Sequence, residues 1–126
     1  MLTELSPVKQ IKGEPRRRWF NSASEDLIVW YAEDNSIFGF QLCYGRPVSE
    51  SALTWLPKPG FTHNRIDDGE GVGLAHKRTP LLMSDSSFDA EALLDKFGEI
   101  SGVLPNEIAA FVLEKLRECV DRAANA

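Results

Sequence analysis

Two groups of charged side chains in the sequence could bind ions or perform acid–base chemistry. The first is the run Arg16–Arg18 in the stretch GEPRRRWF. A guanidinium presents its N–H donors in a planar fork, so arginine runs are typical of sites that bind carboxylates or phosphates. Residues 1–20 carry five Lys and Arg against two Asp and Glu, although the whole chain has a net charge of -5. We therefore expect a basic arm on an acidic body.

Three interpretations of the arginine run are open. It could bind a small anionic ligand or an acidic protein partner. It could instead be a charged strand edge that pairs with nearby carboxylates such as Glu25 and Asp26 and prevents edge-to-edge association of sheets. A nucleic-acid contact through Arg16–Arg18 is the third interpretation, and it is disfavoured because the acidic remainder of the chain would repel phosphate.

The second group lies in FTHNRIDDGEGVGLAHK, residues 61–77, where the metal-capable side chains gather. Its members are His63, Asp67, Asp68, Glu70 and His76. Imidazole and carboxylate groups can hold zinc or manganese, and a histidine beside a carboxylate can act as a general base. The spacing matches no standard metal motif, and DDGEG is typical of a flexible turn between strands. We therefore expect no metal and no cofactor, with a small enzyme or metal-binding protein centred on the loop of His63, Asp67, Asp68 and Glu70 as the alternative.

The rest of the sequence offers no catalytic motif. Cys43 and Cys119 have no CxxC companion, so we expect two free, buried thiols in a reducing cytoplasm. No serine stands in a nucleophile elbow, and GEGVG lacks the Lys-Ser/Thr of a phosphate-binding loop. The sequence therefore names no catalytic residue and favours a binding protein over an enzyme. No apolar signal segment opens the chain and no run approaches the ~20 apolar residues of a membrane helix, which predicts a cytoplasmic protein.

The first two thirds of the chain have the pattern of β-strands, because β-branched and aromatic residues gather in short segments between turn residues. Short turns connect antiparallel strands, so the order predicts a meander of about five to six strands. The strand-like segments lie near residues 6–12, 16–20, 26–33, 37–44, 51–56, 61–67 and 79–84.

The last third predicts two helices, over residues 87–101 and 105–122. Ser86 can cap the first helix with Asp89 as its capping-box partner, and Pro105 suits the first turn of the second. Apolar residues recur at helical spacing in both segments. Strands followed by helices indicate an α+β fold, so we expect a single domain of 126 residues with the helices packed on one face of the sheet.

The register of the central hairpin predicts which side chains share a face of the sheet. A tight turn at Asp34 and Asn35 sets the alignment of its two strands. One face is then apolar, and we assign it to the helices; its pairs are Tyr31–Phe38, Val29–Phe40 and Leu27–Leu42. The opposite face mixes aromatic and polar groups, and its pairs are Trp30–Gly39, Ile28–Gln41 and Asp26–Cys43.

The same reasoning places the arginines. If Trp19 faces Leu27, then Arg16 and Arg18 lie on the mixed face, where Arg18 can stack on Trp30. The neighbouring register would bury both guanidinium groups beneath the helices, at a cost of several kcal/mol each unless they are paired. We therefore predict the first register.

The mixed face is the predicted working surface of a cytoplasmic binding or protein-interaction domain. Nine of the twelve aromatic residues lie between residues 19 and 61, more than one helix-covered face absorbs. The others must face a ligand, a protein partner or a second copy of the chain, so a homodimer is a further expectation. The candidate ligand-binding residues are Arg16, Arg18, Trp30, Gln41, His63 and Arg65.

Several stretches carry a resemblance to a known family, in this order: GEPRRRWF, DLIVWY, GFQLCYG, ALTW, FTHNRIDDGE, TPLL and IAAFVLEKL. Together they resemble a family of short uncharacterised bacterial proteins. The resemblance covers nearly the whole chain, and GEPRRRWF with DLIVWY is its most specific part. It implies a small α+β domain that stands alone in the bacterial cytoplasm, and it assigns no catalytic residue.

Overall fold

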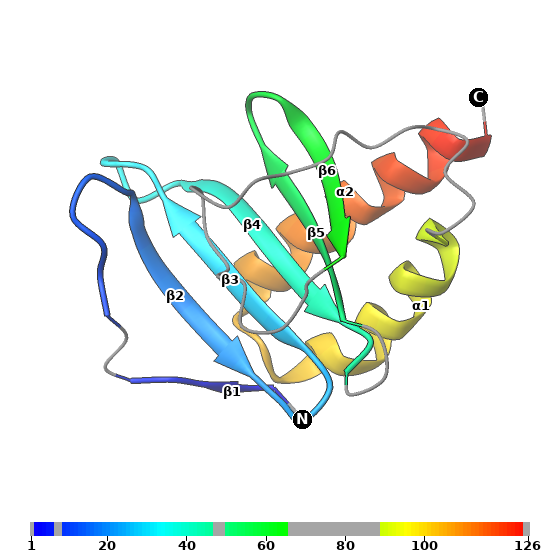
Figure 1. Ribbon diagram of the computed structural model, residues 1–126, viewed down its shortest axis with the longest axis horizontal. Coiled ribbons are helices and arrows are strands. Elements are labelled where there is room, and N and C mark those ends of the chain that lie inside the picture. The colour runs from blue at the N-terminus through cyan, green and yellow to red at the C-terminus, as the bar shows by residue number, and fades with distance from the viewer. Residues whose placement is uncertain (1, 7–8, 47–49, 66–88, 125–126) are drawn as a thin grey trace. The chain divides into compact units, whose positions relative to one another are not determined.

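The computed structural model describes residues 2–6, 9–46, 50–65 and 89–124 (Figure 1). Two compact units make up the chain, Met1–Pro80 and Leu81–Ala126. The described strands belong to the first unit and the described helices to the second, which confirms the α+β class. The packing of the helices on one face of the sheet, and the single domain, stay predictions. None of the described helices is both long enough and apolar enough to cross a membrane.

Six antiparallel strands neighbour one another in chain order, which confirms the predicted meander (Figure 1). They are β1 (Thr3–Glu4), β2 (Arg16–Asn21), β3 (Asp26–Tyr31), β4 (Ile37–Tyr44), β5 (Ser51–Leu56) and β6 (Gly60–Arg65). The predicted strand over 6–12 is wrong, because the described residues of that segment are not in a strand and β1 lies before it. The predicted strand over 79–84 lies outside the described residues.

A glutamine side chain explains why the segment before β2 needs no strand geometry. The side-chain oxygen of Gln10 accepts a hydrogen bond from the backbone N–H of Arg17 (2.9 Å), and its amide nitrogen donates to the carbonyl of Arg17 (3.0 Å). These two bonds are the ones that a neighbouring strand would form at this edge of β2. β1 covers the other end of β2, where Glu4 pairs with Phe20.

The hairpin of β3 and β4 keeps most of its predicted register. The confirmed pairs are Trp30–Gly39, Val29–Phe40, Ile28–Gln41, Leu27–Leu42 and Asp26–Cys43. The predicted pair Tyr31–Phe38 is wrong, because the register shifts after Trp30 and Tyr31 lies opposite Ile37. Phe38 becomes the extra residue of a β-bulge. Its side chain packs against a buried cluster that consists of Ile28, Trp30 and Leu56.

The turn between β3 and β4 causes this shift. Beyond the strand ends, the N–H of Ala32 donates to the carbonyl of Ser36 (2.9 Å), which leaves a loop of three residues, 33–35. Within this loop the N–H of Asn35 donates to the carbonyl of Ala32 (2.9 Å). Asn35 has a positive φ of 70°. A tight turn followed by one left-handed residue is a common three-residue hairpin loop, and asparagine tolerates that conformation better than most residues.

The predicted register of β2 on β3, with Trp19 opposite Leu27, is wrong; the strands adopt the neighbouring register, which we disfavoured because of the cost of burying Arg16 and Arg18. The observed pairs are Arg16–Tyr31, Arg17–Trp30, Arg18–Val29, Trp19–Ile28 and Phe20–Leu27. Residues opposite one another share a face, so Arg16 and Arg18 lie on the face of Val29. Their predicted placement beside Trp30 is therefore wrong.

The β2–β3 turn produces this register. The hydroxyl of Ser22 accepts a hydrogen bond from the N–H of Glu25 (2.9 Å), and the N–H of Ser22 donates to the carbonyl of Glu25 (2.8 Å). Asn21 and Asp26 are thereby paired at the end of a four-residue turn. A serine side chain that bonds to the backbone of its own turn is a common way to hold such a turn.

The second unit contains α1 (Ala90–Ile100), the 3-10 turn η1 (Ser101–Val103) and α2 (Asn106–Ala124). Asp89 caps α1, because its carboxylate accepts a hydrogen bond from the N–H of Ala92 (3.0 Å), and the predicted cap Ser86 lies outside the described residues. Pro105 precedes α2, and its carbonyl accepts from the N–H of Ile108 (3.1 Å). The predicted apolar stripes are buried at Leu93, Phe97, Ile108, Val112, Leu116 and Cys119.

Gly39 tests the packing between β4 and β5. A β-carbon at this position would lie 2.5 Å from the carbonyl oxygen of Trp55 and 2.7 Å from Cδ2 of Leu56. Gly39→Ala should therefore lower the free energy of unfolding by about 2 kcal/mol or more in urea denaturation followed by far-UV circular dichroism, which detects strands and helices. In the control Gly98→Ala, the new β-carbon meets nothing within 4 Å, and α1 should gain roughly 0.5–1 kcal/mol. Equal stabilities of Gly39→Ala and the parent protein would contradict this packing.

Candidate functional site

The three arginines of β2 have three different environments, and Arg17 is the buried one. It exposes 7% of its surface. Its Nε donates to the carbonyl of Lys9 (2.8 Å), and its guanidinium lies 5.2 Å from the centre of the Trp19 ring. Residues two apart along a strand lie on the same side, which brings Arg17 over Trp19. Arg17 therefore ties the segment before β2 to the sheet.

Arg18 forms an ion pair with β1. Its Nε and Nη2 donate to the two carboxylate oxygens of Glu4, both at 2.8 Å, and its guanidinium lies 5.4 Å from the ring centre of Phe20. The predicted stacking on Trp30 is thus replaced by Phe20. The hydrogen bond from Arg18 lowers the pKa of Glu4, and the same bond raises the pKa of Arg18. The pair stabilises the sheet at neutral pH, and its contribution is lost as the pH falls through the lowered pKa of Glu4.

Arg16 is exposed and takes part in none of the ion pairs between described residues. Its guanidinium lies 4.5 Å from the ring centre of Tyr31, and its Nη2 donates to Oδ1 of Asn35 (3.1 Å). A guanidinium has five N–H donors, so this bond leaves most of them for another acceptor. Arg16 is therefore held in place by Tyr31 and Asn35 while its charge has no carboxylate partner in the described part of the chain.

A pocket of about 530 Å³ opens beside Arg16. Its lining comes from the segment before β2, the start of β2, the end of β3, the β3–β4 turn and the start of β4. The described lining residues are Gly13, Glu14, Pro15, Arg16, Tyr31, Ala32, Glu33, Asn35 and Phe38. The lining is thus mixed: Pro15, Tyr31 and Phe38 supply apolar surface beside three charged side chains and one amide, and small-ligand sites likewise combine apolar surface with polar groups that orient the ligand. Sequence reasoning found Arg16 but missed the other lining residues. The signal for them is the EDNS turn, because its asparagine at positive φ and the bulge at Phe38 shape this end of the sheet.

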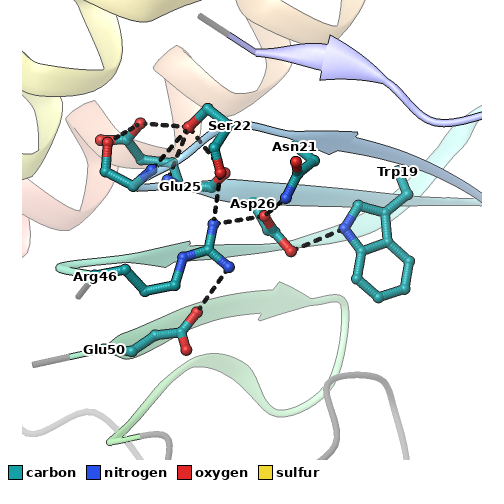
Figure 2. Close-up of polar contacts among 8 residues, drawn as sticks. Trp19, Asn21, Ser22, Glu25, Asp26, Arg46 and Glu50 are labelled. Carbon is teal, nitrogen blue, oxygen red and sulfur yellow. Dashed lines mark hydrogen bonds and ion pairs between the residues drawn. The ribbon is translucent and has the colours of Figure 1, made fainter.

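A second polar cluster surrounds Asp26 at the other end of β3 (Figure 2). Its carboxylate accepts hydrogen bonds from Trp19 Nε1 (3.0 Å), Asn21 Nδ2 (2.6 Å) and Arg46 Nη2 (2.7 Å). Arg46 also contacts Glu50 (3.4 Å) and donates to the carbonyl of Ser22 (3.0 Å). A carboxylate with 7% exposure needs such partners to remain charged. Asp26 therefore joins the β2–β3 turn to the segment after β4, and its partner is Arg46 in place of the run Arg16–Arg18.

Both cysteines are free and buried, as predicted. Cys43 lies opposite Asp26 in the sheet. Burial raises the pKa of the Cys43 thiol to about 12, and the carboxylates of Glu50 and Asp26 add to the increase. Burial also raises the pKa of Cys119, to about 11. Neither thiol ionises appreciably near neutral pH, so neither is suited to nucleophilic chemistry.

The other predicted ligand-binding residues do not join Arg16 in one surface. Trp30 and Gln41 are buried, with 0% and 1% of their surfaces exposed. His63 shares the face of Arg16 and Arg18, because it pairs with Leu53, which pairs with Leu42. It lies on β6, however, and β3, β4 and β5 separate that strand from β2; its Nε2 is 2.6 Å from the hydroxyl of Tyr44. Arg65 is the last residue of β6, and its side chain lies outside the description. The predicted grouping of these side chains on one mixed face is therefore wrong, because the β2–β3 register places the arginines on the face opposite Trp30 and Gln41.

The predicted metal candidates fall mostly outside the description. His63 is described, whereas Asp67, Asp68, Glu70 and His76 are not among the described residues. Within the ranges that the structure describes, no group of three or more His, Cys, Asp or Glu side chains could hold a metal ion.

No protein-family model matches the chain, and no curated protein or solved structure matches it either. The function therefore has to be inferred from the chemistry of the described residues, above all from Arg16 and its pocket.

The different environments of Arg16 and Arg17 predict different effects on stability. Arg17→Ala should lower the free energy of unfolding by about 2 kcal/mol, because it removes buried packing and leaves the Lys9 carbonyl without its donor. Arg16→Ala is the matched control and should cost within about 0.5 kcal/mol, since Arg16 is exposed. Urea denaturation measures both variants. A larger loss for Arg16→Ala than for Arg17→Ala would contradict these assignments.

The raised thiol pKa values predict slow alkylation of the folded protein. At pH 8 a thiol whose pKa is about 12 is ionised to roughly one part in 10,000, against about a quarter for an ordinary cysteine. Iodoacetamide should therefore modify Cys43 at least about 100-fold more slowly in the folded protein than in the urea-unfolded chain, as followed by mass spectrometry. Equal rates of Cys43 modification in the folded and the urea-unfolded protein would show that this thiol is not buried and that its pKa is not raised.

Proposed function

We propose that this protein is a binding domain that holds the carboxylate of a small organic ligand in the pocket beside Arg16. The supporting observation is the contrast within β2. Arg17 is buried and Arg18 is paired with Glu4, whereas Arg16 forms no ion pair with a carboxylate of the described residues. A cation that the fold positions without neutralising it is suited to bind an anion.

Two contacts prepare Arg16 for this role. The ring of Tyr31 supports the guanidinium at 4.5 Å, and Asn35 accepts one of its hydrogen bonds at 3.1 Å. Both contacts restrict the long side chain before a ligand binds, so that less conformational entropy is lost on binding. The planar fork can then donate two parallel hydrogen bonds to one carboxylate.

The remaining lining favours a small molecule with an apolar part. Pro15, Tyr31 and Phe38 supply apolar and aromatic surface, and a volume of about 530 Å³ falls within the range of small-molecule pockets. These properties favour a small ligand over an acidic protein partner. From the resemblance of the sequence we also propose a bacterial, cytoplasmic protein, and the two free thiols are consistent with that location.

The test uses 3-phenylpropanoate, a carboxylic acid with an aromatic body. It should raise the melting temperature of the sheet in a saturable manner, by about 5 °C at a concentration tenfold above Kd. Tryptophan fluorescence reports on the sheet, because Trp19, Trp30 and Trp55 all lie in its strands. Arg16→Gln should weaken binding about tenfold or more, since a hydrogen bond to a charged group contributes about 1.5–3 kcal/mol.

The control is Arg117→Gln, which removes an exposed arginine from α2. It alters the net charge by the same amount and should leave binding of 3-phenylpropanoate unchanged. Binding that weakens equally in both variants would point to a general charge effect and would refute the pocket as the site.

A further inference from the structure

We infer that the ligand is a zwitterion, with an amino group that Glu14 binds while Arg16 holds the carboxylate. This inference rests on the proposed function and names the class of ligand that the same pocket takes. The class is that of α-amino acids and related small ammonium carboxylates.

The charge of the lining is the first observation. Among the described residues that line the pocket, Arg16 is the one cation, and Glu14 and Glu33 supply two carboxylates. None of the ion pairs between described residues includes either of these carboxylates. A ligand with a carboxylate alone would meet two like charges and one opposite charge. A ligand that also has an ammonium group would instead place its carboxylate beside the Arg16 cation and its ammonium group beside a carboxylate of the pocket.

The environment of Glu14 is the second observation. Its Oε1 is buried and has no hydrogen-bond partner among the described residues. A buried acceptor without a donor is unfavourable, and a carboxylate oxygen more so than a neutral one. An ammonium group with three N–H donors can satisfy Glu14 when the side chain turns this oxygen toward the pocket.

The backbone before β2 holds Glu14 next to Arg16. The N–H of Glu14 donates to the carbonyl of Ile11 (3.0 Å), which closes a turn that has Gly13 at a positive φ of 90°. Pro15 follows directly and restricts the backbone of Glu14. The Glu-Pro-Arg segment therefore contributes one acidic and one basic side chain to the lining of the same pocket, as recognition of a zwitterion requires.

Three probes that share one phenyl ring test this inference by isothermal titration. Phenylalanine carries both charged groups, 3-phenylpropanoate lacks the amino group, and 2-phenylethylamine lacks the carboxylate. Phenylalanine should bind at least about tenfold more tightly than either of the others, because it alone pairs with Glu14 and Arg16 together. Glu14→Gln should reduce the preference for phenylalanine over 3-phenylpropanoate to about threefold or less.

The control is Glu114→Gln, which removes an exposed carboxylate from α2 and should leave the preference unchanged. If 3-phenylpropanoate binds as tightly as phenylalanine and both depend on Arg16, the zwitterion inference is overturned and the proposed function stands. If Arg16→Gln weakens the binding of neither phenylalanine nor 3-phenylpropanoate, the proposed function is overturned and this inference fails with it. A preference for phenylalanine that survives in Glu14→Gln also overturns the inference.

Discussion

The turn between β2 and β3 fixes the register of β2 and therefore the face of the sheet on which each of its charged side chains lies. The hydroxyl of Ser22 accepts the N–H of Glu25, and this bond closes a four-residue turn that pairs Asn21 with Asp26. A shift of one residue would send every side chain of β2 to the other face. The turn therefore places Arg17 with Trp30 and leaves Arg16 and Arg18 on the opposite side.

Each charge that this register brings toward the interior has a compensating partner. Arg18 has the carboxylate of Glu4, and Arg17 has the carbonyl of Lys9. Asp26 is served by Trp19, Asn21 and Arg46, so the acidic side of the turn is satisfied as well (Figure 2). Unpaired charges inside a protein cost several kcal/mol, which explains why these contacts accompany the register. Arg16 lies at the exposed end of β2, where water removes this requirement and the charge remains for a ligand.

The β3–β4 turn shapes the pocket beside the Arg16 guanidinium. Asn35 at positive φ lengthens the loop by one residue, and its side chain accepts a hydrogen bond from Arg16. The resulting bulge frees Phe38 from its strand pair, and Phe38 then contributes to both the buried cluster and the pocket wall. The β2–β3 turn therefore sets the register that places Arg16, and the β3–β4 turn shapes the pocket beside it.

The sequence by itself determined the α+β class, the meander, most of the β3–β4 register and the free buried cysteines. Those features follow from hydrophobic periodicity and turn composition, which act over a few neighbouring residues. It did not determine the β2 register or the pocket beside Arg16. The prediction assumed that this register would bury Arg16 and Arg18, whereas Arg16 is exposed and stacks on Tyr31, and the half-buried Arg18 pairs with Glu4, which is distant in sequence. Only the tertiary structure decides which groups meet, because the free energy of a charge depends on partners that the chain brings together by folding.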